Sequence, residues 1–151
     1  MPLMRRWHAL VAALAPSRPP PPPRQGLRDP LGPAGERVAA RHIRAEGMRI
    51  LERNARTRVG EVDLIALDPD KRTIVLVEVK ARRIDAEDER RSPRPEAAVG
   101  ERKRRKLLML AESLARTRGW RDRPMRIDVV AVEWPERGRP RVRRFERAVT
   151  W

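Results

Sequence analysis

The pattern of hydrophobic and polar positions predicts a central β-hairpin. Two short runs rich in Val, Ile and Leu, residues 58–66 and 74–80, have the length and composition of β-strands. The connector between them, residues 67–72, is polar and contains both Pro and Asp, which is typical of a hairpin loop. We therefore expect the chain to be organised around this hairpin.

The remaining elements follow from the same patterns. An Ala-rich segment, residues 35–46, favours a helix that Gly47 would end. A longer amphipathic helix is expected over residues 101–118. Further strands are expected at residues 48–52, 126–132 and 140–145, and a charged loop at residues 85–95. The resulting order predicts an α/β protein with a mixed central sheet flanked by helices.

The first 33 residues differ in composition from the rest of the chain. Nine of the 15 prolines fall in this segment, and the run at residues 19–23 favours an extended polyproline II conformation. An apolar stretch after Arg5 and Arg6 resembles a weak signal peptide, but it is too short to span a bilayer. We interpret residues 1–33 as a disordered Pro- and Arg-rich extension and residues 34–151 as the folded domain of a cytoplasmic protein without membrane contact.

The charge of the chain indicates a polyanionic partner. There are 36 Lys and Arg against 21 Asp and Glu, a net charge of +15, and residues 1–33 contribute only +4 of it, which leaves +11 for the domain. A positive field of this size attracts nucleic acid, the commonest polyanion. Single-strand binders stack bases on aromatic side chains, and this chain has no Tyr, one Phe and four Trp, none of which cluster in the sequence. Duplex or junction DNA is therefore the expected partner.

The scarcity of Cys and His limits the possible chemistry. The chain has no Cys, which excludes disulfides and thiolate metal sites. His8 and His42 are its two histidines and lie far apart in the sequence, so a His-rich metal site or a Ser–His–Asp triad is poorly supported. A metal ion would have to be held by oxygen atoms, which favours Mg²⁺, Mn²⁺ or Ca²⁺.

Two carboxylates and a lysine in the hairpin form the main candidate site. Side chains alternate along a strand, so Glu78 and Lys80 share one face and Val79 points to the other. Strand pairing would bring Asp63 beside Glu78, and these two acids with the Val79 carbonyl would suit an open Mg²⁺ site. Lys80 would orient an attacking water or offset developing negative charge, as phosphodiester hydrolysis requires. A buried acid–lysine pair that only fixes the strand register is the alternative.

Other charged residues are secondary candidates. Glu36 would add a carboxylate if its helix packs across the hairpin, although an acid in the first turn of a helix is also stabilising by itself. Glu61 nominally shares the face of Asp63. Five cations open the second helix, where the helix dipole disfavours them unless a phosphate docks there, and a solvated helix face is the alternative. They are Arg102, Lys103, Arg104, Arg105 and Lys106.

The hairpin sequence also resembles a known family. Gly60-Glu61-Val62-Asp63-Leu64-Ile65 followed by Val77-Glu78-Val79-Lys80 resembles the PD-(D/E)XK nuclease superfamily. More closely, it resembles the bacterial YraN-like family, which is similar to archaeal Holliday-junction resolvases. Further short matches spread this resemblance over about residues 32–149; they are Gly35-Glu36, residues 50–54, Ala98-Val99 with Lys103, residues 126–130 and Phe145-Glu146.

The resemblance implies both a fold and a set of roles. The implied fold is a restriction-endonuclease-like αβββαβ core. The implied metal ligands are Asp63 and Glu78, with Lys80 catalytic and Glu36 contributing from the first helix. The proline of the superfamily's name is absent, because Val62 precedes Asp63 in this chain.

Two functions follow from these observations. The first is a Mg²⁺-dependent endonuclease that hydrolyses phosphodiester bonds in DNA, including branched or junction DNA, for which a two-fold homodimer presenting two sites would be suited. The alternative is a nucleic-acid-binding module without physiologically relevant cleavage. A third and weaker hypothesis is an interaction adaptor whose proline run, residues 19–23, serves as a ligand.

Overall fold

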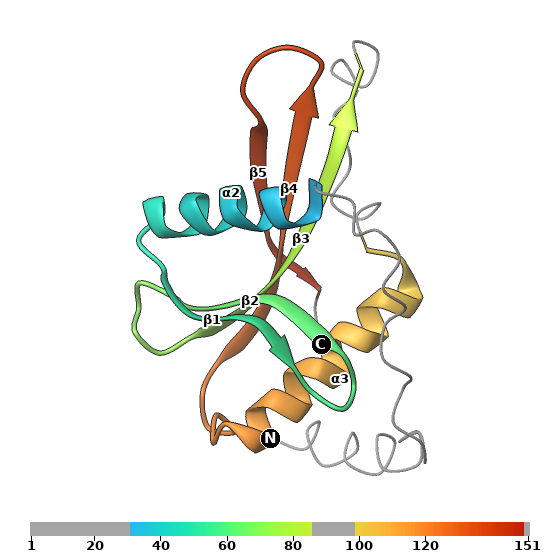
Figure 1. The fold of residues 1–151 in the computed structure, drawn as a ribbon. Coiled ribbons are helices and arrows are strands. Elements are labelled where there is room, and N and C mark those ends of the chain that lie inside the picture. Colours follow the sequence, from blue (N-terminus) through green and yellow to red (C-terminus); the bar gives the residue numbers. More distant parts are fainter. Residues whose placement is uncertain (1–30, 86–98, 150–151) are drawn as a thin grey trace.

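A five-stranded sheet lies between two helices (Figure 1) in the computed structural model of the chain, which describes residues 31–85 and 99–149. The elements are α2 (Leu31–Ala45), β1 (Arg49–Arg56), β2 (Glu61–Leu67), β3 (Ile74–Ile84), α3 (Glu101–Thr117), β4 (Met125–Pro135) and β5 (Arg141–Val149). The strands lie in sequence order across the sheet, with β3 and β4 parallel and the other neighbours antiparallel. The predicted α/β class, with a mixed sheet flanked by helices and an αβββαβ core, is confirmed.

The segments without a predicted place in the core fall largely outside the described residues. The Pro-rich extension, residues 1–33, lies outside them except for its last three residues, which belong to α2. The charged segment, residues 85–95, lies outside them except for Asp85. In the two described ranges, no helix has both the length and the apolar character needed to cross a membrane.

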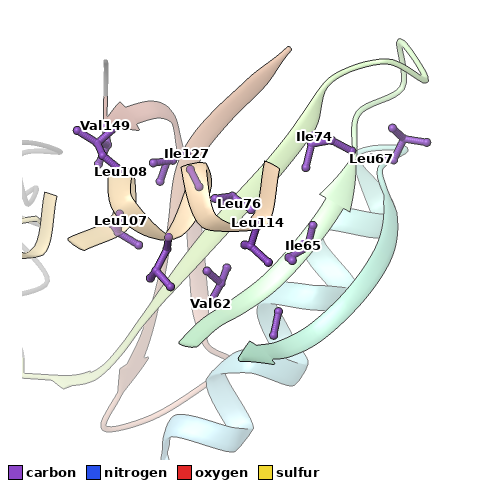
Figure 2. Packing of buried hydrophobic residues seen from close by; sticks show 13 residues of the cluster. Val62, Ile65, Leu67, Ile74, Leu76, Leu107, Leu108, Leu114, Ile127 and Val149 are labelled. Carbon is purple, nitrogen blue, oxygen red and sulfur yellow. The ribbon is translucent and has the colours of Figure 1, made fainter. Parts of the chain in front are cut away.

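Each face of the sheet is covered by one helix, because β2 and β3 carry apolar side chains on both faces. On one face, Ile65 and Leu76 pack against Leu107 and Leu114 of α3 (Figure 2). On the other face, α2 buries Ala39, Ala40 and Ile43 against a second apolar cluster that includes Leu64 and Val77. Each fully buried Leu or Ile stabilises the fold by roughly 1.5–3 kcal/mol, so the two layers fix the sheet between the helices.

Helix α2 begins earlier than the sequence pattern predicted. It starts at Leu31, and Pro33 lies in its first turn, where the missing N–H of proline would have no intrahelical partner. No acidic residue lies in that first turn, so Glu36 falls one turn further in. The interpretation of Glu36 as an acid stabilising the helix N-terminus is therefore wrong. The helix ends as predicted, with Gly47 in the left-handed conformation at a φ of 85°.

Strand β1 is longer than expected. Residues 53–56 continue the strand instead of forming a polar connection. They remain paired with β2 as far as Arg56 opposite Glu61, and Ala55 is buried in the core on the α3 face. Backbone pairing with a buried neighbour therefore extends the strand beyond its apolar residues.

The sheet divides in the middle of β3. Strands β2 and β3 pair from Leu67–Ile74 to Leu64–Val77, whereas β3 stays paired with β4 as far as Ile84. The second half of β3 rises with β4 and β5 away from β1 and β2 (Figure 1). The backbone of β3 beyond Val77 is thus released from its ladder with β2, at the point where β2 carries Asp63.

Candidate active site

Asp63 lies at the point where the sheet divides. Its Oδ2 accepts a hydrogen bond from the backbone N–H of Val79, with a distance of 2.7 Å between N and O. This contact replaces the ladder bond that a longer β2–β3 pairing would have made. The side chain of Asp63 is thereby held against the backbone of β3 at Val79, which lies between Glu78 and Lys80 in the sequence.

The surroundings of Asp63 disfavour its negative charge. Burial, and then repulsion from Glu78, raise the pKa of this carboxyl group from 3.8 to about 6. The Val79 N–H and the Lys103 ammonium act in the opposite direction, while Glu36 adds further repulsion. A carboxylate among other carboxylates that keeps an unfavourable charge at neutral pH is typical of a functional site.

Glu78 is buried on the α3 face, with 5% of its surface exposed, and contacts two lysines. Its Oε1 lies 3.1 Å from the Nζ of Lys80 and 2.9 Å from the Nζ of Lys103. Lys80 is two residues along β3, and its contact shows that the two side chains share a face. Lys103 comes from the first turn of α3 and reaches the site from the helix that covers this face.

The position of Lys103 was not predicted from the pattern of charges. The sequence placed it among five phosphate-binding cations, without a contact to Glu78. The available signal was the match of Lys103, together with Val99, in the family resemblance. Alternation along β3 could not indicate this contact, because it depends on how α3 packs over the sheet.

Glu36 and Asp63 line an open pocket of about 390 Å³ between the start of α2 and β3. Lys80 also borders this pocket, as do Val79 and Ala81. Helix α2 packs closely on β3 at Gly35, because a Cβ at that position would lie 2.6 Å from the Cβ of Ala81. The close crossing of α2 over β3 therefore brings Glu36 towards Asp63.

The other candidates lie apart from this pocket. Glu61 is half-buried and forms an ion pair with Arg56, with 3.3 Å between Oε2 and Nε. It does not line the pocket with Asp63. The structure thus brings together Glu36, Asp63, Glu78 and Lys80, but not Glu61.

The five cations that open α3 do not share one environment. Lys103 contacts Glu78, while Arg105 pairs with the exposed Glu101 at 3.4 Å. The side chain of Lys106 covers Gly60, whose φ of 152° is a conformation that favours glycine. Arg102 is exposed and Arg104 is half-buried. Their role in binding phosphate stays a prediction.

The donor atoms suit a hard divalent cation. Within residues 31–85 and 99–149, no three His, Asp or Glu side chains form a group that could hold a metal ion. Asp63 and Glu78, however, repel each other strongly enough to affect the pKa of Asp63. Mg²⁺ is commonly held by one or two carboxylates together with water, so this pair fits such an ion.

The fold and the site define a class of protein. It is a mixed α/β protein in which two carboxylates and two lysines meet where the central sheet divides. Residues 35–132 match the family described as Uncharacterised protein family UPF0102. The chain belongs to the UPF0102 family.

Curated relatives support this membership. A UPF0102 protein of Anaeromyxobacter dehalogenans (strain 2CP-C) is 40% identical over 121 residues, which cover 80% of this chain and 84% of the relative. A UPF0102 protein of Symbiobacterium thermophilum is 43% identical over 118 residues, covering 78% of this chain and 94% of the relative. One from Arthrobacter sp. (strain FB24) is 41% identical over 115 residues, covering 76% and 92%. The similarity thus spans most of each protein.

Proposed function

We propose that this protein is a metal-dependent endonuclease of the PD-(D/E)XK type that hydrolyses phosphodiester bonds in DNA, including branched or junction DNA. The observation that carries the proposal is the convergence of Asp63, Glu78 and Lys80 where β2 and β3 separate. The net charge of +11 over residues 34–151 supports a nucleic-acid substrate. A chromosomal or junction substrate implies a cytoplasmic location.

Asp63 and Glu78 would hold a Mg²⁺ or Mn²⁺ ion, with the backbone carbonyl of Val79 as a further oxygen donor. When bound, such an ion lowers the pKa of a coordinated water and offsets charge on a phosphate oxygen. Its presence would also neutralise the repulsion between Asp63 and Glu78. The buried, mutually repelling acids are the feature of this chain that favours a bound cation.

The other residues of the site have separate roles in this proposal. Lys80 is held by Glu78 at 3.1 Å and borders the pocket, so its ammonium would orient the attacking water or stabilise negative charge on the phosphate. Glu36 lines the same pocket and would accept a hydrogen bond from that water. Lys103 pairs with the same Oε1 of Glu78, so its ammonium would compete with the metal ion for this carboxylate.

The test is a cleavage assay with matched variants. Purified protein is incubated with supercoiled plasmid, linear duplex and four-way junctions in Mg²⁺ or Mn²⁺. We expect cleavage that is lost in Asp63→Ala and Lys80→Ala and retained in Arg41→Gln, since Arg41 is exposed on the outer side of α2. Equal cleavage by all variants would assign the activity to a contaminant and contradict the proposal.

A second function, nucleic-acid binding without relevant cleavage, is favoured by one specific contact. The Oε1 of Glu78 already pairs with two ammonium groups, and these compete with any metal ion. In that case Asp63→Ala would bind duplex DNA as well as the unmodified protein and neither would cleave it. Binding would still weaken steeply with salt, because bound phosphates release counterions.

A further inference from the structure

The ammonium group of Lys103 acts on both acids of the candidate metal site. Its Nζ lies 2.9 Å from the Oε1 of Glu78. Its charge also lowers the pKa of Asp63, against the effects of burial and of Glu78. Lys103 thus offsets the negative charge of the two carboxylates that a divalent ion would bind, and the two cations compete for one position.

Of the two lysines on Glu78, Lys103 is the one that a divalent ion would displace. Glu78 and Lys80 lie two residues apart on β3, and both are paired with β4, so the strand backbone keeps these two side chains together. Lys103 reaches the carboxylate from α3 through a flexible four-carbon side chain that is 34% exposed. A divalent ion brings two positive charges to the same oxygen atoms, which repel the ammonium of Lys103.

A displaced Lys103 would need a new anionic partner. Among the described residues, Glu78 is the only carboxylate that contacts it. Glu101 is the one acid among the first six residues of α3, but it pairs with Arg105 at 3.4 Å. Residues two apart on a helix do not face each other, so Glu101 cannot replace Glu78. The N-terminus of α3 also carries partial positive charge, and an anion from outside the chain would therefore stabilise the ammonium there.

We propose that Lys103 leaves Glu78 when a divalent ion binds there and then contacts a phosphate of the DNA backbone. This inference rests on the proposed nuclease function and adds a coupling between its metal ion and its substrate. Lys80 and Lys103 both lie within 3.1 Å of one oxygen atom of Glu78, so a phosphate beside the bound ion lies within reach of Lys103. Metal ion and DNA then strengthen each other's binding by the same factor.

The test measures how much a divalent ion strengthens DNA binding in three proteins. They are the unmodified protein, Lys103→Gln and the control Arg116→Gln. Arg116 is exposed in the last turn of the same helix, about 20 Å from Lys103 along its axis, so the control loses an equal charge away from Glu78. Thermal unfolding establishes that each variant folds, and calorimetry gives the Mn²⁺ concentration that saturates each one.

Binding of a short, fluorescently labelled duplex is measured by anisotropy in EDTA and in saturating Mn²⁺ at constant ionic strength. Readings are taken while a denaturing gel shows intact duplex. A direct contact between the ion and DNA raises the affinity of all three proteins, so the difference between their gains reports Lys103. We expect the gain of Lys103→Gln to be about five- to tenfold smaller than that of the unmodified protein, and the gain of Arg116→Gln to be unchanged.

Three results would overturn the inference. They are an equal gain in Lys103→Gln and the unmodified protein, an equal reduction in Arg116→Gln, and no gain in the unmodified protein. The first would show that Lys103 stays on Glu78, and the second would assign the effect to the net charge of the chain. The third would remove the coupling itself.

The measurement separates this inference from the nuclease proposal, because it needs no cleavage. A protein that cleaves DNA, but whose gain does not depend on Lys103, would contradict only the role of Lys103. A protein whose gain depends on Lys103, but that never cleaves, would contradict only the nuclease.

Discussion

At the scale of single residues, Asp63 is the group whose charge the fold disfavours and the proposed function requires. It is held by the Val79 N–H at 2.7 Å, yet burial and the neighbouring Glu78 make its charged form unfavourable. Folded proteins retain such groups where function requires a charge that the fold alone disfavours. Asp63 is therefore expected to reduce stability in the absence of a cation.

Asp63→Asn should stabilise the protein at neutral and alkaline pH. The pKa of Asp63 is raised from 3.8 to about 6, so its favourable contribution is fully present below 3.8 and is lost as the pH rises through 6. Asparagine stays neutral and can still accept from Val79, which removes a penalty of up to about 3 kcal/mol. Thermal unfolding should show a higher Tm for the variant near about pH 8 and little difference near about pH 4.

The exposed Asp122 provides the control for this measurement. Asp122→Asn removes the same charge from the turn after α3 and should leave Tm unchanged at both pH values. A difference between Asp63→Asn and the unmodified protein that did not depend on pH would contradict the assigned cause.

Lys103 is the second residue-scale feature, because its ammonium occupies the position where a cation is expected to bind. Lys103→Gln should strengthen Mn²⁺ binding about three- to tenfold, since it removes a competing positive charge 2.9 Å from Glu78. Isothermal titration calorimetry measures the change, with Lys106→Gln as a control from the next turn of α3. Weaker binding in Lys103→Gln would instead make Lys103 a required support of Glu78.

At the scale of elements, the crossing of α2 over β3 builds the pocket. Gly35 lies where the helix approaches Ala81, and Glu36 follows it directly into the pocket. Any side chain at position 35 must push the helix away from the strand. The close approach of α2 to β3 therefore requires a residue without a Cβ at position 35.

Gly35→Ala should destabilise the fold by roughly 1–3 kcal/mol, the usual effect of overpacking. Its new Cβ would lie 2.6 Å from the Cβ of Ala81. Gly32→Ala is the matched control in the same helix, because no atom lies within 4 Å of its Cβ. Urea unfolding should show no loss for the control, whose stability could rise by up to about 1 kcal/mol. A similar loss in both variants would contradict the close crossing at Gly35 as its cause.

The elements were predictable where their local pattern is strong. The apolar runs of β2 and β3 and the stripe of α3 gave the right type of element and the right order. The ends of β1 and β3 were missed, because Arg53, Arg56 and Arg82 are polar and show no apolar alternation. These residues are strand through pairing with neighbours and through ion pairs such as Arg82 with Glu133.

The candidate site was likewise predictable only where a local pattern places its residues. Alternation along β3 placed Glu78 and Lys80 on one face, and their contact at 3.1 Å agrees with it. The contact of Asp63 with the Val79 backbone was not predictable, because it arises from the division of the sheet. The ligand roles of these residues remain predictions.

At the scale of the whole molecule, a buried charged cluster ties β5 to the rest of the sheet. Asp128 of β4 is completely buried and accepts hydrogen bonds from Nη1 of Arg144 at 2.8 Å and the backbone N–H of Arg147 at 2.9 Å. Arg126 contacts the same carboxylate at 3.2 Å. Arg144 of β5 also contacts Glu46, which directly follows α2, so the cluster connects β5 to the C-terminal end of this helix as well.

Asp128→Ala should therefore lower the free energy of unfolding by about 3–5 kcal/mol, because it leaves buried guanidinium groups without their partner. Urea unfolding measures the loss, and the exposed Asp122→Ala should change stability by less than about 0.5 kcal/mol. A loss below about 1 kcal/mol for Asp128→Ala would indicate that water replaces the carboxylate and that the cluster does not stabilise the fold.

The central claim is that Asp63 and Glu78 form a divalent metal site. Calorimetric titration of Mn²⁺ into the purified protein tests it most directly, with Asp63→Ala as the comparison. We predict saturable binding at one site per chain that Asp63→Ala abolishes, accompanied in the unmodified protein by a rise in Tm as Mn²⁺ is added. No saturable binding, or equal binding by both proteins, would contradict the account.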